Sequence, residues 1–110
     1  MITFIARLHV PPENALAFEE LMTYVAAMTN EHEPGVAYYA FAKSVDEADT
    51  YVLVEVYRDQ AAHAWHMETD WVRASLPKSM RLIKGKPHIM QYVSLGTEPA
   101  VRRLKENWHE

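Results

Sequence analysis

The segment 51–57, YVLVEVY, is apolar on both faces of a strand except for one acid, Glu55. Side chains alternate between the two faces of a β-strand, so a strand with one face in water alternates apolar and polar residues. Here the three valines lie on one face, while Leu53, Glu55 and the two tyrosines lie on the other. We therefore expect a strand whose two faces are both covered.

The segments on either side predict the helices that cover one of these faces. Apolar residues recur at helical spacing between residues 15 and 31, and Pro34-Gly35 ends the pattern. Asp59 is a good N-cap for a second helix, 60–68. A third helix, 71–83, is expected to be kinked or interrupted by its proline, Pro77. Strands are expected at 2–10, 35–44, 51–57 and 88–95.

The order of these elements, β-α-β-β-α-β, predicts a ferredoxin-like α+β fold, in which a four-stranded antiparallel sheet carries its helices on one face. A chain of 110 residues suffices for one such domain, which we place at residues 1–96. Residues 97–110 are expected to form a C-terminal tail, helical from Thr97, that docks on its own subunit or on a partner.

The second apolar face of the strand needs a cover of its own. The simplest cover is the sheet of a second copy, which predicts a homodimer through the sheet faces, a dimeric α+β barrel. The alternative is an exposed face that tolerates its aromatic side chains.

Composition excludes several classes of function. The net charge of −4 and the lack of a basic cluster argue against nucleic-acid binding, and no apolar run approaches the ~20 residues of a membrane span. There is no cysteine and no glycine-rich phosphate loop. The N-terminus carries no basic leader, so a cytoplasmic location is expected.

Two titratable residues in and after the strand 51–57 are candidates for chemistry. His66 changes charge near neutral pH, which suits an acid or base, although it could equally hold its helix in place through a hydrogen bond to the strand. Glu55 needs a partner if it is buried, and Arg7 or His9 on the neighbouring strand could supply it. We therefore expect Glu55 and Arg7 to form a structural ion pair.

The remaining candidates are weaker. His63 and His66 are three residues apart on a helix and could share a metal ion, but no third ligand is placed, so no metal site is predicted. Trp65 and Trp71 could line an aromatic pocket or fill the core.

Residues of the third strand and second helix resemble the signature of the antibiotic biosynthesis monooxygenase (ABM) domain family, and the resemblance extends over residues 1–96. The matching positions are Glu55, Tyr57, Asp59, Ala62, His66 and Thr69, with Pro34-Gly35 and Tyr39 at the second strand and Pro12-Glu13 before the first helix.

This resemblance implies a dimeric α+β barrel with a pocket between helices and sheet in each subunit. It implies a monooxygenase that needs no cofactor and acts on a small hydroxyaromatic or a quinol, with His66 as catalytic group and Tyr39, Trp65 and Trp71 as substrate contacts. The family also contains haem-degrading enzymes, a branch acting on a phosphorylated sugar, and proteins without an assigned substrate.

The sequence departs from some of these branches. Where haem-degrading members carry Asn, Trp and His, this chain has Ala6, His66 and Leu76, so haem degradation is not expected. A second histidine found in many members is replaced by Trp71. Two alternatives remain: a non-catalytic ligand-binding or interaction module, and an isomerase of a phosphorylated small molecule. The isomerase would need a cation in the pocket, for which Arg7, Arg73 and Lys78 are the candidates.

Overall fold

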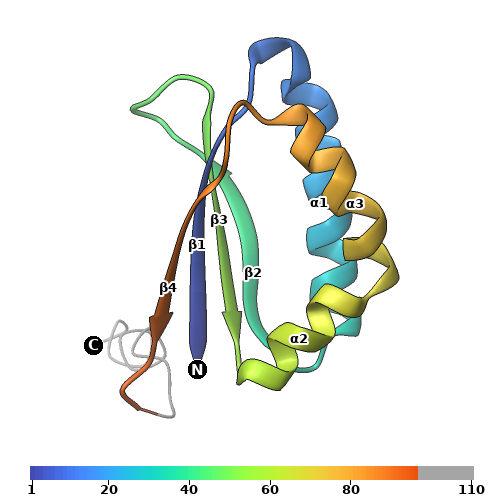
Figure 1. Cartoon of the computed structure of the whole chain (residues 1–110), viewed down its shortest axis with the longest axis vertical. Coiled ribbons are helices and arrows are strands. Elements are labelled where there is room, and N and C mark those ends of the chain that lie inside the picture. Colours follow the sequence, from blue (N-terminus) through green and yellow to red (C-terminus); the bar gives the residue numbers. More distant parts are fainter. Residues whose placement is uncertain (97–110) are drawn as a thin grey trace, which may run out of the picture.

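The structure, a computed structural model, describes residues 1–96, and the expectations for the tail fall outside that range. Four antiparallel strands form one sheet in the order β2-β3-β1-β4. They are β1 (Ile2–His9), β2 (Val36–Lys43), β3 (Thr50–Tyr57) and β4 (His88–Val93). The helices, which cover one face of the sheet (Figure 1), are α1 (Ala15–His32), α2 (Gln60–Glu68) and α3 (Asp70–Leu82), with a 3-10 turn η1 (Pro12–Asn14) before α1. The predicted ferredoxin-like α+β fold is confirmed.

Strand β3 is an inner strand of the sheet, because it pairs with β2 on one side and with β1 on the other. Its Leu53 and Glu55 face the helices and border the space beneath them, while its three valines face the other way. On the helix side β1 contributes Ala6 and Leu8, both buried. The parity of the strand therefore places Glu55 under the helices and not on the open face of the sheet.

A β-bulge in β2 determines which side chain stands opposite Glu55. The pairing of β2 with β3 shifts by one residue between Val36 and Tyr38, so that Tyr39 becomes the partner of Glu55. Val36 and Tyr39 consequently share the helix side although they are three positions apart. Tyr38 is turned to the open face, where it is 55% exposed.

The core between the sheet and α1 consists of two clusters. Near the start of α1, the rings of Phe18 and Tyr51 lie 5.0 Å apart at their centroids, and the phenol of Tyr51 donates to Glu19. Near the middle of α1, Val25 packs with Tyr39 and with residues of α3. These clusters hold α1 against the sheet.

Local signals set the ends of α2 and α3. The Asp59 carboxylate accepts from Ala62 N at 2.9 Å and caps α2, as predicted. Thr69 joins the two helices, since its Oγ1 donates to the carbonyl of His66 at 2.7 Å and accepts from Val72 N. Pro77 lies inside α3, which continues past it. Within residues 1–96, no helix has both the length and the apolar character needed to cross a bilayer.

Candidate functional site

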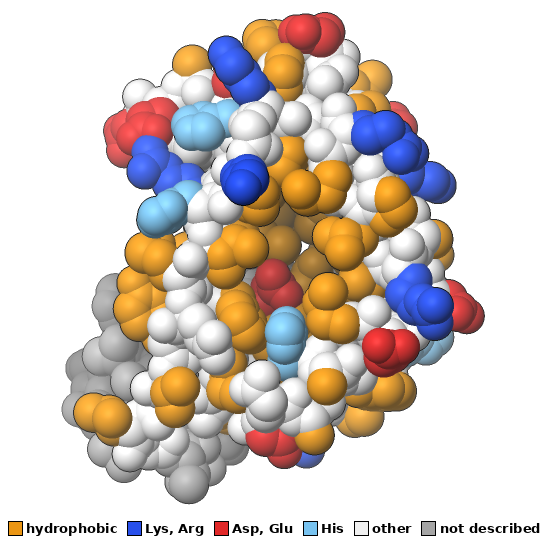
Figure 2. Space-filling view, viewed as in Figure 1, with side chains coloured by type: hydrophobic (Ala, Val, Ile, Leu, Met, Phe, Trp, Pro, Cys, Tyr) orange, Lys and Arg blue, Asp and Glu red, His pale blue; other side chains and the backbone are white. Residues whose placement is uncertain are grey.

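A cavity of about 360 Å³ lies between the sheet and the helices. Its floor is buried and comes from β1, β2, β3 and α1, whereas its rim is exposed and comes from Met67 on α2, Leu76 and Met80 on α3, and Ile89 on β4. Figure 2 shows the hollow from this side: hydrophobic side chains line most of it, and acidic and histidine side chains meet at one end. The cavity is thus apolar with one polar end.

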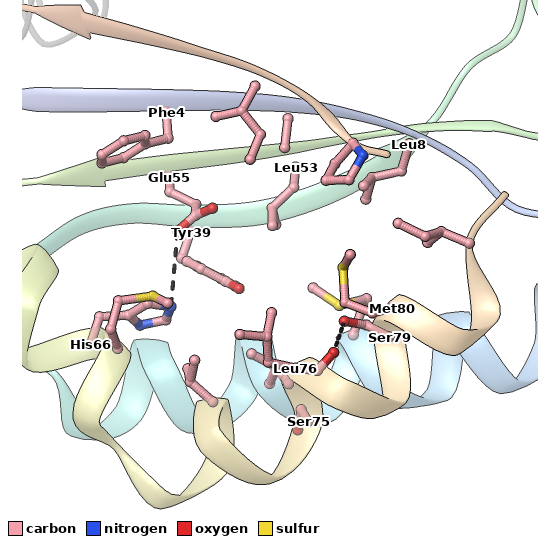
Figure 3. A pocket seen from close by; sticks show the side chains of 18 of the residues that line it. Phe4, Leu8, Tyr39, Leu53, Glu55, His66, Ser75, Leu76, Ser79 and Met80 are labelled. Atoms are coloured by element: carbon pink, nitrogen blue, oxygen red, sulfur yellow. Dashed lines mark hydrogen bonds and ion pairs between the residues drawn. The ribbon is translucent and has the colours of Figure 1, made fainter. Parts of the chain in front are cut away.

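The polar end is built where α2 crosses the sheet. Glu55 on β3, with His63 and His66 on α2, lines this end, and Tyr39 from β2 stands beside them. In Figure 3 the carboxyl group of Glu55 reaches from the sheet toward the imidazole of His66. The ring of Tyr57 also lies against His66, 5.4 Å away between centroids. Strand, bulge and helix together bring these groups to one place.

A buried acid, Glu33, contacts His66 on the side of the ring away from Glu55. Glu33 is the residue that follows the last turn of α1. The Nδ1 of His66 lies 2.9 Å from each carboxylate oxygen of Glu33, and the two side chains are 3% and 0% exposed. The indole Nε1 of Trp71 donates to the same carboxylate at 2.9 Å. Three elements, α1, α2 and α3, therefore meet at the Glu33 carboxylate.

Glu55 faces the other nitrogen of the same imidazole. His66 Nε2 lies 3.9 Å from Glu55 Oε1, which is longer than a hydrogen bond. Oε1 also accepts a hydrogen bond from the Tyr57 hydroxyl. Burial raises the pKa of Glu55, and this outweighs the opposing effects of the Tyr57 hydroxyl and of the nearby His66.

Burial shifts the pKa of the two phenols and of the second histidine at this end in the direction that favours their neutral forms. Burial, reinforced by the nearby carboxylates, raises the pKa of Tyr39 and that of Tyr57 far above the ordinary value. Burial, with His66 nearby, lowers the pKa of His63, whose ring stacks 4.4 Å from that of Phe4. Glu33, His66 and Glu55 thus form an acid–histidine–acid row at the polar end of the cavity.

The structure corrects the predicted pairing of Glu55. Arg7 points to the open face of the sheet and forms an ion pair with Glu47, while Glu55 lies on the helix side. The two residues cannot meet within one chain, because neighbouring strands place them on opposite faces. The expected Glu55–Arg7 ion pair is therefore wrong within the chain.

Of the three predicted substrate contacts, the structure places one at the cavity and two outside its lining. Tyr39 lines the cavity, but Trp65 is 48% exposed and neither tryptophan borders it. Trp71 binds Glu33 instead, with the ring of His32 lying 5.5 Å from its own. Among residues 1–96, no group of three or more metal-binding side chains comes together.

Sequence reasoning missed Glu33. An acid at the C-terminal end of a helix faces the negative end of the helix dipole, which is unfavourable unless a specific partner compensates. The position of Glu33, directly before Pro34-Gly35, carried that signal.

The fold and the site define a ferredoxin-like domain with an apolar cavity that ends at an acid–histidine row. The chain belongs to the antibiotic biosynthesis monooxygenase (ABM) family, whose model matches residues 1–77. This confirms the resemblance seen in its third strand and second helix. No curated protein matches the sequence significantly.

Solved structures agree with this assignment. A candidate antibiotic biosynthesis monooxygenase from Caulobacter crescentus has 28% identity and a TM-score of 0.82, over 86% of this chain and 90% of that chain. A second candidate from Nitrosomonas europaea, at 22% identity, gives a TM-score of 0.80 over 87% of this chain and 100% of that one. A protein from Mycobacterium tuberculosis, also at 22% identity, gives a TM-score of 0.78 over 86% of this chain and 95% of that chain. The last two similarities, being more distant, bear on the fold alone.

Proposed function

We propose that the protein is a monooxygenase of the ABM type that uses no cofactor and oxidises a small hydroxyaromatic or quinol, with His66 as the base. The observation that carries the proposal is the cavity itself, which is apolar along its walls and ends at His66. Cavities of this size suit small organic ligands, and apolar walls suit the rings of an aromatic one.

The chemistry needs a base and a dry site. Deprotonation of the hydroxyl gives an electron-rich anion, which passes electrons to dioxygen. For a quinol the sum is quinol plus dioxygen to hydroxyquinone plus water, in which one oxygen atom enters the ring and the other leaves as water. Dioxygen is the oxidant and the substrate supplies all the electrons. His66 Nε2, at the cavity end, would take the hydroxyl proton.

The composition of the cavity wall disfavours the isomerase alternative. A phosphorylated ligand needs a cation or an array of N–H donors, and the cavity lining within residues 1–96 contains neither Lys nor Arg. Arg7 lies on the open face, and Arg73 and Lys78 are exposed on α3. A non-catalytic binding module remains the second candidate, because the same cavity could bind an aromatic ligand without reacting.

Oxygen uptake on a panel of quinols and anthrones tests the oxygenase proposal, and product mass shows whether one oxygen atom enters the ring. His66→Ala should lower kcat/KM by about 10²–10⁴, the usual contribution of a general base. His88→Ala removes an exposed histidine outside the cavity lining and is the matched control.

Two results would count against the proposal. Turnover that is equal in His66→Ala and wild type removes the role of His66. Tight binding of the aromatic panel without oxygen consumption by any member favours the binding module.

A further inference from the structure

The carboxylate of Glu33 can only accept hydrogen bonds, and both of its known partners are N–H groups. The Nε1 of Trp71 is always a donor, and His66 Nδ1 lies 2.9 Å from both oxygens. The side chain of Glu33 is fully buried, so no solvent competes for these oxygens. The arrangement therefore requires a proton on Nδ1 of His66.

A proton on Nδ1 fixes the character of the opposite nitrogen. In the neutral ring only one nitrogen carries hydrogen, so Nε2 presents a lone pair to the cavity. The nearest acid, Glu55 Oε1, is 3.9 Å from Nε2 and already accepts from the Tyr57 hydroxyl. Figure 3 shows this pair at the cavity end, marked by a dashed line. A ligand that enters the cavity meets a hydrogen-bond acceptor at Nε2.

We propose that Glu33 is a positioning residue that sets the hydrogen-bond polarity of the cavity end, holding His66 in the tautomer whose Nε2 accepts the hydroxyl proton of a neutral ligand. In the transfer, the ligand O–H bond breaks, an Nε2–H bond forms and the electron pair stays on oxygen. The resulting imidazolium is balanced by the buried Glu33 carboxylate. The inference uses the proposed function only for the choice of a hydroxyaromatic ligand.

The same polarity predicts which ligands the site rejects. An anionic group brought to Nε2 would meet a lone pair and the Glu55 carboxyl, and the lining within residues 1–96 offers it no Lys or Arg. An ether of the same shape lacks the proton that Nε2 accepts. A neutral phenol should therefore bind better than either its methyl ether or the matching carboxylate.

Glu33→Gln is the informative substitution, because it keeps the shape and reverses the polarity. The indole of Trp71 needs an acceptor, so it holds the carbonyl oxygen of the new amide. The amide NH₂ is then left facing Nδ1 of His66. That nitrogen must become the acceptor, and the ring switches to the tautomer that carries its proton on Nε2. An acid-to-amide change beside a catalytic histidine acts in this way in serine proteases.

Two measurements report the hydrogen-bond polarity of the cavity end and do not require that the protein turn over a substrate. Nitrogen-15 NMR of the His66 side chain, assigned with His66→Ala, reports the tautomer. Titration with 2-naphthol, 2-methoxynaphthalene and 2-naphthoate reports the ligand preference. We expect the Nδ1–H tautomer and at least about a tenfold preference for the naphthol in the wild type, and loss of both in Glu33→Gln. Trp71→Phe removes one donor to Glu33 and leaves its contact with His66, so the tautomer should stay unchanged.

A wild-type ring that carries its proton on Nε2 would overturn the inference, and this result does not depend on whether Glu33→Gln folds. Two further results would overturn it. One is a wild-type protein that does not prefer 2-naphthol to its methyl ether and the carboxylate, and the other is a folded Glu33→Gln protein that keeps this preference. The proposed function can fail separately: no oxygen uptake with tautomer and preference intact refutes the oxygenase and leaves the role of Glu33 standing.

Discussion

At the scale of single residues, Glu55 should make the stability of the protein depend on pH. Burial raises its pKa in the folded state, so the folded protein holds this proton more tightly than the unfolded chain does. The associated stability is present in full below the unfolded pKa and is lost as pH rises through the folded pKa. Glu55→Gln cannot ionise and still accepts from Tyr57. Its free energy of unfolding relative to the wild type should therefore rise with pH.

Urea titrations of both proteins between mildly acidic and mildly alkaline pH measure this difference. Glu20→Gln is the control, because Glu20 is an exposed acid on α1. Glu47 is also exposed but forms an ion pair with Arg7, so its substitution would remove an interaction. The Glu20 variant should follow the wild-type curve. Parallel curves for wild type and Glu55→Gln would mean that Glu55 has the same pKa in the folded and unfolded states.

Residue patterns predicted part of the site and missed the rest for identifiable reasons. Alternation along β3 placed Glu55 correctly with Leu53, because that strand is regular. Alternation along β2 could not place Tyr39, because the bulge that turns it toward the helices depends on pairing with β3. Glu33 was missed because its partners, His66 and Trp71, lie more than thirty residues away in the chain.

At the scale of elements, Gly35 sets how closely β2 approaches α2. A Cβ at this position would lie 2.5 Å from the Cβ of Ala62, well inside contact distance. Gly35→Ala should therefore push the first turns of α2 from the sheet and destabilise the protein by about 1–3 kcal/mol. Because His66 lies on α2, the substitution should also disturb the cavity end.

A double-mutant cycle separates this clash from other effects. Ala62→Gly alone costs about 0.5–1 kcal/mol, the ordinary penalty for glycine in a helix. Combined with Gly35→Ala it relieves the close contact, so the double variant should be more stable than the sum of the single effects. Strict additivity in denaturant titrations would show that the two positions do not touch.

Element boundaries were predictable because their signals are local. Asp59 and Thr69 cap helices within a few residues of themselves, and Pro34-Gly35 follows directly on the end of α1. Pro77 shows the limit of such signals. Pro77 removes only one backbone hydrogen bond, and the packing of α3 against α1 and α2 keeps the helix intact.

At the scale of the whole molecule, the open face of the sheet raises the question of what covers it. The helices occupy one face (Figure 1), and the other carries a mainly apolar surface. Its apolar side chains are Ile5, Tyr38, Ala40, Ala42, Val52, Val54, Val56, Met90 and Tyr92, and Arg7 lies on the same face. The two tyrosines are 55% and 51% exposed. Apolar patches of this kind on a small domain mark contact surfaces.

We propose that a second copy of the chain covers this face through a two-fold contact, in which each copy presents the same patch to the other. Val54 lies at its centre, since it pairs with Ile5 on one side and Ala40 on the other. Val54→Glu would place two like, unpaired charges in the contact and should yield a monomer. Ala27→Glu, on the exposed side of α1, should leave the mass unchanged. Sedimentation velocity decides: a monomeric wild type, or a Val54→Glu protein with the mass of a dimer, contradicts the proposal.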